Sequence, residues 1–272
     1  NINKDIILTI QEFKNLKNRK KPFAMVTAYD FISAKIIDEL EIPAILVGDS
    51  ASMVIYGYDN TIPISMDQML LVVRAVTRAT KKTLVIADMP FSSYQSSVQS
   101  SIENACQLIK YGRANAIKLE GGVYFTKHIK GIVNAGIPVM GHIGLLPQSI
   151  NIQSGYKVQG KNKKDAKKIY DDALALEEAG AFAIVLEGLP ENLSKKITDD
   201  LSIPTIGIGA GRYCSGQIQV YHDILGLLPS FKPKHSKKFI NLHKLIGEGI
   251  TDYKNAVESN VFPGLSNIVK SI

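Results

Sequence analysis

Short apolar runs rich in β-branched residues alternate with amphipathic segments along most of the chain. We predict strands at eight of these runs, residues 23–29, 44–50, 83–90, 116–121, 138–144, 183–188, 204–210 and 220–225. Between them, apolar side chains recur at helical spacing, which predicts helices at residues 32–41, 65–80, 97–112 and 163–180. Strands that alternate with helices are typical of a parallel sheet, and uninterrupted apolar runs fit strands buried on both faces.

An Ile-Pro step marks the beginning of three predicted strands, at residues 42–43, 137–138 and 203–204. Proline has no amide hydrogen, so it is tolerated at the start of a strand but not in the middle of a sheet. Eight β/α units in 272 residues match a TIM (β/α)8 barrel, which typically needs about 250 residues. We therefore predict one α/β barrel domain over residues 1–272. An open doubly wound sheet is the alternative, because only residues 211–219 separate the last two predicted strands and a parallel crossover usually needs about a dozen residues.

Both ends of the chain carry predicted helices outside the alternating pattern. Residues 5–18 place Ile6, Ile10 and Phe13 at helical spacing, with Asp5 available as the N-cap. This pattern predicts an extra N-terminal helix within residues 1–20, packed on the barrel and closing its bottom. Residues 243–260 predict one or two closing helices within a C-terminal segment, 239–272.

Four of the predicted strands end in an acidic residue, namely Asp49, Asp88, Glu120 and Glu187. Active sites of parallel barrels lie at the carboxyl ends of the strands, so these carboxylates are predicted to meet at one mouth. Lys118 lies two residues before Glu120 and faces the same way, and His142 ends the fifth strand. Taken singly, such an aspartate can cap a helix and such a histidine can belong to the core. The recurrence of acids at strand ends favours a functional site.

Carboxylates that gather in one place repel each other unless a cation or shared protons compensate their charge. Oxygen ligands without cysteine favour a hard cation, and Mg²⁺ suits two or three carboxylates with water in its remaining positions. A fourth carboxylate is then available as a general base. The strand ends therefore predict an enzyme with a magnesium site.

Composition narrows the class of protein. The net charge is +7, with lysines concentrated in residues 156–168 and 231–238, which fit solvated loops or attraction of anionic small molecules. No aromatic-interleaved basic motif accompanies them, so we expect no nucleic-acid partner. Cys106 and Cys214 are isolated, which argues against a disulfide framework and favours a reducing cytoplasm. No apolar run approaches the ~20 residues of a membrane span, and no signal-peptide pattern is visible, so we expect neither a membrane partner nor export.

Nine motifs occur along the chain in the order VTAYD (26–30), VGDS (47–50), ADMPF (87–91), IKLEGG (117–122), GHIGLLPQS (141–149), SGYKVQG (154–160), DALALEEAGA (172–181), VLEG (185–188) and PTIGIGAG (204–211). From about residue 23 to residue 263, the chain resembles the ketopantoate hydroxymethyltransferase family. The resemblance implies transfer of a hydroxymethyl group from 5,10-methylenetetrahydrofolate to 3-methyl-2-oxobutanoate through a Mg²⁺-stabilised enolate. The product would be 2-dehydropantoate, for pantothenate and coenzyme A biosynthesis. It also implies a homo-oligomer, a decamer.

The same resemblance implies roles for individual residues. The metal-site acids would be Asp49, Asp88 and Glu120, and the substrate-binding residues Asp49, Ser50, Asp88 and Lys118. Glu187 would be the proton acceptor, and His142 matches a position near the site without an assigned step. Ser215 departs from the family, which usually has an acid there, and could alter a loop near the folate. Ser52 stands where a glycine is common.

One other kind of enzyme fits the same acids. A Mg²⁺-dependent 2-keto-acid barrel enzyme, such as a carbon–carbon lyase or a relative of phosphoenolpyruvate mutase, would share the metal and the enolate but need no folate. Residues 207–211 (GIGAG) could then bind phosphate, as glycine-rich loops after late barrel strands often do. A basic nucleic-acid-binding barrel, by contrast, would leave the acids without a role.

Overall fold

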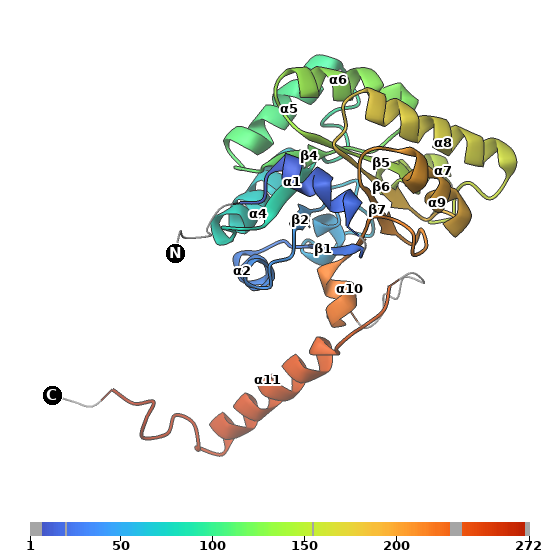
Figure 1. Ribbon diagram of the computed structural model, residues 1–272. Helices are drawn as coiled ribbons and strands as arrows, with labels where there is room; N and C mark the ends of the chain where they lie inside the picture. Colours follow the sequence, from blue (N-terminus) through green and yellow to red (C-terminus); the bar gives the residue numbers. More distant parts are fainter. Residues whose placement is uncertain (1–6, 20, 154, 229–235, 270–272) are drawn as a thin grey trace. The chain divides into compact units, whose positions relative to one another are not determined.

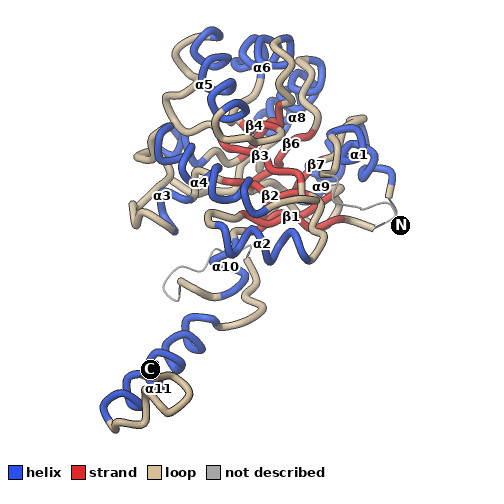
Figure 2. Tube along the Cα trace, turned by 90° about the vertical axis from the view of Figure 1, so that its left-hand side faces the viewer, coloured by secondary structure: helices blue, strands red, loops and turns tan. Residues whose placement is uncertain are grey.

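The computed structural model describes residues 7–19, 21–153, 155–228 and 236–269. The chain divides into two compact units, residues 1–220 and 221–272. In the first unit, the strands form a closed parallel barrel in which each strand pairs with the next and β8 pairs with β1 (Figures 1 and 2). The predicted TIM barrel is therefore confirmed and the open sheet is excluded. The expectation that residues 1–272 form a single domain stays a prediction.

The barrel strands are β1 (Phe23–Thr27), β2 (Ala44–Val47), β3 (Leu84–Asp88), β4 (Ala116–Lys118), β5 (Val139–Gly144), β6 (Ala183–Glu187), β7 (Thr205–Ile208) and β8 (Gly216–Gln219). The first seven lie within the predicted runs. The helices of this unit that follow β1 are α2 (Phe31–Glu39), α3 (Ala51–Val54), α4 (Met66–Ala79), α5 (Val98–Lys110), α6 (Thr126–Asn134), α7 (Ile150–Gln153), α8 (Lys163–Glu178) and α9 (Glu191–Asp200). Short 3₁₀ turns are η1 (Leu16–Asn18), η2 (Val123–Phe125) and η3 (Pro147–Ser149).

The four predicted helices correspond to α2, α4, α5 and α8, and each begins at a polar N-cap. The cap side chains of Asp30, Ser65, Ser97 and Asn162 accept a hydrogen bond from a backbone N–H of the first turn. These bonds satisfy amide groups that have no partner within the helix, so the caps fix where each helix starts.

The prediction of the eighth strand at residues 220–225 is wrong. The strand is β8, where Gly216 pairs with Phe23 of β1 and Ile206 of β7, and Tyr221–Leu225 forms the helix α10. Only alternate residues of β8 are buried, so its sequence lacks the continuous apolar run by which the other strands were found. The crossover from β7, residues 209–215, contains no helix. Gly209 and Gly211 have positive φ values of 61° and 78° there, so the glycines of the GIGAG segment serve a tight crossover.

The N-terminal helix closes the bottom of the barrel, by which we mean the amino ends of the strands. It comprises α1 (Ile10–Asn15) and then η1, and begins in a capping box between Thr9 and Glu12. Phe13 is fully buried, and its ring makes edge-to-face contacts with Phe23 and Phe182 at centroid distances of 5.4 and 5.7 Å. The prediction of a helix that plugs the bottom is confirmed, whereas Asp5 and Ile6 lie outside the described residues.

The barrel interior changes from apolar to polar along its axis. Its lower part is filled by a buried apolar cluster that includes Leu46, Ile86, Met140 and Val185. Two residues further along their strands, the inward positions become Asp88, His142 and Glu187. The fold therefore delivers polar side chains to the mouth, by which we mean the carboxyl ends of the strands.

The second unit contains α10 and the longer helix α11 (Leu242–Glu258), which matches the predicted helix at residues 243–260. Along α11, apolar side chains such as Leu245, Ile246 and Ile250 are exposed. Among the helices of the described ranges, none has both the length and the apolar character that crossing a membrane requires.

Candidate active site at the barrel mouth

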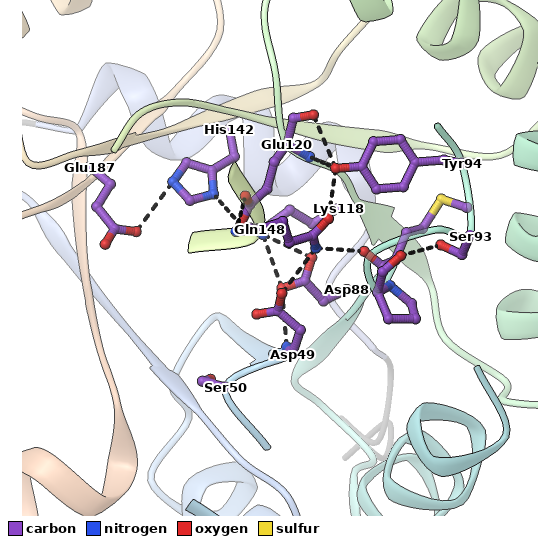
Figure 3. A network of polar contacts seen from close by, with 12 residues as sticks. Asp49, Ser50, Asp88, Ser93, Tyr94, Lys118, Glu120, His142, Gln148 and Glu187 are labelled. Carbon is purple, nitrogen blue, oxygen red and sulfur yellow. Dashed lines mark hydrogen bonds and ion pairs between the residues drawn. The ribbon is translucent and has the colours of Figure 1, made fainter. Parts of the chain in front are cut away.

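The residues predicted from the strand ends meet at the mouth of the barrel (Figure 3). The most deeply buried of them, at most 4% exposed, are Asp49, Asp88, Lys118, Glu120 and His142. Ser50 and Glu187 are partly buried. The prediction that these side chains meet at one mouth is therefore confirmed, and the role of each stays a prediction.

Lys118 is held between two carboxylates. Its Nζ donates to Oδ1 and Oδ2 of Asp88 at 2.8 and 2.9 Å, and lies 3.6 Å from Oε1 of Glu120. Burial alone would lower the pKa of Lys118, but the negative charges of Asp88, Glu120 and Asp49 outweigh it and raise that pKa above its ordinary value. The lysine therefore stays charged and neutralises one carboxylate of the site.

Asp49 lies against Asp88 rather than capping a helix. Its backbone N–H donates to Asp88 Oδ2 at 3.2 Å, and its own Oδ2 accepts from Gln148 Nε2 at 2.9 Å. Burial, followed by the negative charges of Asp88 and Glu120, raises the pKa of Asp49 well above its ordinary value. A carboxylate held among like charges in a buried cleft is typical of a functional site.

His142 bridges two carboxylates on opposite sides of its ring. Nδ1 lies 3.4 Å from Oε1 of Glu120, and Nε2 lies 3.2 Å from Oε2 of Glu187. Burial and Lys118 lower the pKa of His142, but the two glutamates outweigh them and raise it to about 9. For Glu120, burial raises the pKa, yet Lys118 and His142 prevail and lower it. The site thus contains an imidazole between two glutamate side chains, one of which, Glu187, is 13% exposed at its side chain.

The donor chemistry of the mouth fits Mg²⁺. Among the described residues, no group of three or more histidine, cysteine, aspartate or glutamate side chains is arranged to hold a metal ion. Mg²⁺ needs fewer protein ligands, because it usually keeps several waters and takes one or two carboxylates with substrate oxygens. Asp49 and Asp88 supply two adjacent carboxylates, and the buried Oε1 of Glu120 accepts no hydrogen bond. The metal set Asp49, Asp88 and Glu120 stays a prediction that this chemistry supports.

Comparison with known families covers nearly the whole chain. Residues 7–265 match the model of the ketopantoate hydroxymethyltransferase family. This chain belongs to that family of transferases. A 3-methyl-2-oxobutanoate hydroxymethyltransferase of Clostridium botulinum (strain Langeland / NCTC 10281 / Type F) is 53% identical over 255 residues, 94% of this chain and 93% of the relative. The protein of the same name from Clostridium kluyveri is 52% identical over 254 residues, 93% of this chain and 91% of that one.

A likeness to solved structures concerns the fold alone. Phosphonopyruvate hydrolase superposes with a TM-score of 0.63 over 98% of this chain and 92% of its own, at 14% sequence identity. The barrel of the ketopantoate hydroxymethyltransferase family thus shares its architecture with an enzyme of different chemistry. Identity at this level gives no support to the lyase or mutase alternative.

Two neutral side chains of the site were missed by the sequence analysis. Gln148 lies within η3, in the connection that follows β5, and Tyr94 lies in the loop after β3. Both are buried and hydrogen-bonded to each other at 2.8 Å. Tyr29, which shares a 2.7 Å hydrogen bond with Ser50, was quoted only within a motif. Gln148 and Tyr29 belong to motifs that the chain shares with the family, and this was the one sequence signal for them. A search for charged residues does not find amide or phenol side chains.

Ser215 is one of the two positions at which the chain departs from the family pattern. Ser215 immediately precedes β8, and it exchanges two 3.3 Å hydrogen bonds with Thr205 at the start of β7. Both residues are at the amino ends of their strands, so Ser215 lies at the bottom of the barrel. The expectation that it alters a loop near the folate stays a prediction, and Ser215 does not lie in a loop at the mouth. Ser52, the other position, lies in the first turn of α3, and its hydroxyl donates to the carbonyl of Asn60 at 2.7 Å.

Proposed function

We propose that this chain transfers a hydroxymethyl group from 5,10-methylenetetrahydrofolate to 3-methyl-2-oxobutanoate, giving 2-dehydropantoate for pantothenate and coenzyme A biosynthesis. Membership of the family and the names of relatives at 53% identity support the reaction. The observation that carries the proposal is the arrangement at the mouth, where a buried aspartate–lysine cluster lies across His142 from a partly exposed glutamate (Figure 3).

Glu187 is suited to take the proton from C3 of the keto acid. Its carboxylate lies 3.2 Å from Nε2 of His142, and its side chain retains access to the mouth. The imidazole beside it orients the Glu187 carboxylate, and a positioned carboxylate can serve as a general base. Water breaks the two bonds from the methylene carbon to the folate nitrogens, which leaves tetrahydrofolate and releases the carbon at the oxidation level of formaldehyde. The electron pair left on C3 then forms the new bond to that carbon, and the formaldehyde oxygen takes up a proton to become the product hydroxyl.

The opposite side of the mouth is suited to hold the α-keto acid. Mg²⁺ held by Asp49 and Asp88 would supply a Lewis acid for the keto oxygen. Lys118 contributes a fixed positive charge for the substrate carboxylate, and its two bonds to Asp88 keep the ammonium in place. The Ser50 hydroxyl, oriented by Tyr29, adds a neutral hydrogen-bonding group. Substrate would thus be fixed on this side while Glu187 approaches C3 from the other.

Deuterium exchange tests this assignment. The enzyme is mixed with 3-methyl-2-oxobutanoate and Mg²⁺ in D₂O, with and without 5,10-methylenetetrahydrofolate, and both C3 deuteration and product are followed by NMR and mass spectrometry. We expect exchange of the C3 proton in both mixtures and 2-dehydropantoate only with the folate. Cleavage of a 2-keto or 2-hydroxy acid without folate, and no hydroxymethylated product, would favour the lyase alternative instead.

Two further properties follow from the family and are part of the proposal. The chain would form a homo-oligomer, a decamer. It would act on small molecules in the cytoplasm. Light scattering on a size-exclusion column would determine the mass of the particle, and a monomeric mass would contradict the proposed assembly.

A further inference from the structure

The side-chain amide of Gln148 has a partner for each of its hydrogen-bonding positions. Oε1 accepts from the Tyr94 hydroxyl at 2.8 Å and from Gln95 Nε2 at 3.2 Å. Nε2 donates to Asp49 Oδ2 and to the Met89 carbonyl, both at 2.9 Å. An amide offers two acceptor positions and two donors, so this group is fully satisfied. Turning it over would place its oxygen against the Asp49 carboxylate, which fixes its polarity.

Tyr94 helps to hold the orientation of that amide. It is 1% exposed, and its ring packs edge-to-face on Phe125 at 5.3 Å, so the ring is held by packing. Its oxygen accepts from the backbone N–H of Glu120 at 3.2 Å. The single hydroxyl proton has two acceptors within reach, Gln148 Oε1 at 2.8 Å and the Glu120 carbonyl at 3.1 Å, and the shorter contact is with Gln148.

The backbone of Gln148 holds a second carboxylate of the site. Its N–H donates to Glu120 Oε2 at 3.0 Å, while its side chain holds Asp49 Oδ2. One residue in the loop after β5 therefore fixes one oxygen of each of two acids that come from β2 and β4. Within the described residues, the other oxygens, Asp49 Oδ1 and Glu120 Oε1, accept no hydrogen bond.

We propose that Gln148 and Tyr94 are positioning residues of this site. By engaging Oδ2 of Asp49, the Gln148 amide fixes the plane of that carboxylate and leaves Oδ1 to face a divalent cation and its waters. The Gln148 backbone holds Glu120 Oε2, while Glu120 Oε1 faces His142 Nδ1 and Lys118 Nζ. Tyr94 acts through Gln148, because its hydroxyl holds the amide oxygen on the side away from Asp49. The inference rests on the proposed metal site, but it concerns residues to which the proposed reaction gives no role.

Metal affinity without turnover tests the role of Gln148. Methionine has a similar length and volume but no amide, so Gln148→Met removes both side-chain donors while the backbone bond to Glu120 remains. Free Mn²⁺ is counted by electron paramagnetic resonance during titration of the metal-free enzyme, with thermal melting measured on the same samples. Groups that orient metal ligands typically contribute 10–100-fold to affinity, so we expect Mn²⁺ binding at least about 10-fold weaker by a protein that still melts cooperatively.

Gln153→Met is the matched control. Gln153 holds the same loop through the Leu146 N–H at 3.0 Å and the Gly144 carbonyl at 3.1 Å, but touches none of the acids. Its Mn²⁺ affinity is expected to equal that of the wild type. Equal weakening in both variants would mean that the loop as a whole matters, which overturns a specific role for Gln148.

A double-mutant cycle tests whether Tyr94 acts through Gln148. Tyr94→Phe keeps the ring on Phe125 and removes only the hydroxyl, so it also serves if Gln148→Met does not fold. We expect weaker Mn²⁺ binding by Tyr94→Phe, and no additional loss when it is combined with Gln148→Met. Additive losses would show that Tyr94 acts on the acids by another route.

The outcomes separate this inference from the proposed function. If the wild type binds no Mn²⁺, the metal site itself is wrong. If the wild type binds Mn²⁺ and both Gln148→Met and Tyr94→Phe bind it equally well, with only a lower melting temperature, the two residues are structural and the positioning role is refuted.

Discussion

Replacing Glu187 with glutamine isolates the proposed proton acceptor. The amide has the same size and can keep the 3.2 Å contact with His142 Nε2, but it cannot accept the proton from C3. Because glutamine has nearly the same volume and can keep the contact with His142, the fold should survive. A positioned general base contributes roughly 10²–10⁴-fold in rate. Each tenfold loss of rate corresponds to about 1.4 kcal/mol, so we expect the activation free energy of proton abstraction to rise by about 3–5 kcal/mol.

The assay follows C3–H exchange in D₂O and product formation together, with Mn²⁺ affinity and melting on the same preparation. Exchange and product should fall in parallel while Mn²⁺ affinity is unchanged, because Asp49 and Asp88 are intact. Glu191→Gln, four residues along the chain and paired with Arg212 at 3.1 Å on the surface, is the matched control and should keep full activity. Exchange at the wild-type rate in Glu187→Gln would remove this residue from the mechanism, and rescue by excess Mg²⁺ would make it a metal ligand.

Three other predictions concern the metal site, the bottom of the barrel and acid stability. Asp49→Asn should weaken Mn²⁺ binding greatly with little change in melting, since mouth residues serve function more than stability; normal binding would contradict the site. Phe13→Ala should lower the free energy of unfolding by about 3–5 kcal/mol in denaturant titrations, because the ring is fully buried. An unchanged free energy of unfolding would contradict the packing of the N-terminal helix against the bottom of the barrel. Burial raises the pKa of Asp38, but hydrogen bonds from the backbone N–H groups of Lys82, Thr83 and Lys81 outweigh burial and lower this pKa. The ionised Asp38 therefore stabilises the fold at neutral pH, and this stabilisation is lost as the pH falls through the lowered pKa. Asp38→Asn should therefore be less stable than the wild type at pH 7, with a difference that shrinks below about pH 4; a constant difference would contradict this.

The position of the site followed from the sequence because a parallel barrel puts all carboxyl strand ends at one mouth. An acid after each of β2, β3, β4 and β6 was therefore enough to predict that these side chains meet, without knowing their distances. The eighth strand could not be found in the same way. Gly216–Gln219 has polar residues at alternate positions, so its membership of the sheet depends on pairing with β1 and β7 rather than on its own pattern.

The neutral residues of the site lay beyond sequence reasoning for a different reason. A glutamine in a loop has no intrinsic preference for aspartate, and Gln148 acquires its role only when the loop after β5 places it against Asp49. Likewise, His142 is recognisable as a strand-end histidine, but its contacts with Glu120 and Glu187 depend on the spacing of three neighbouring strands. Charged side chains at strand ends can be recognised in a sequence as candidate site residues. Neutral residues that position them can be recognised only from their contacts in the folded structure.

The charge balance of the mouth connects these observations. When the acids are ionised, four carboxylates, from Asp49, Asp88, Glu120 and Glu187, face the ammonium of Lys118 and the imidazolium of His142. Two negative charges then remain uncompensated. Burial, followed by the negative charges of Asp88 and Glu120, raises the pKa of Asp49. A divalent cation at Asp49 and Asp88 would neutralise the excess on that side and leave Glu187 paired with His142 on the other. In the proposed reaction, this separation would allow one end of the substrate to be held by positive charge while Glu187 acts as a base at its C3.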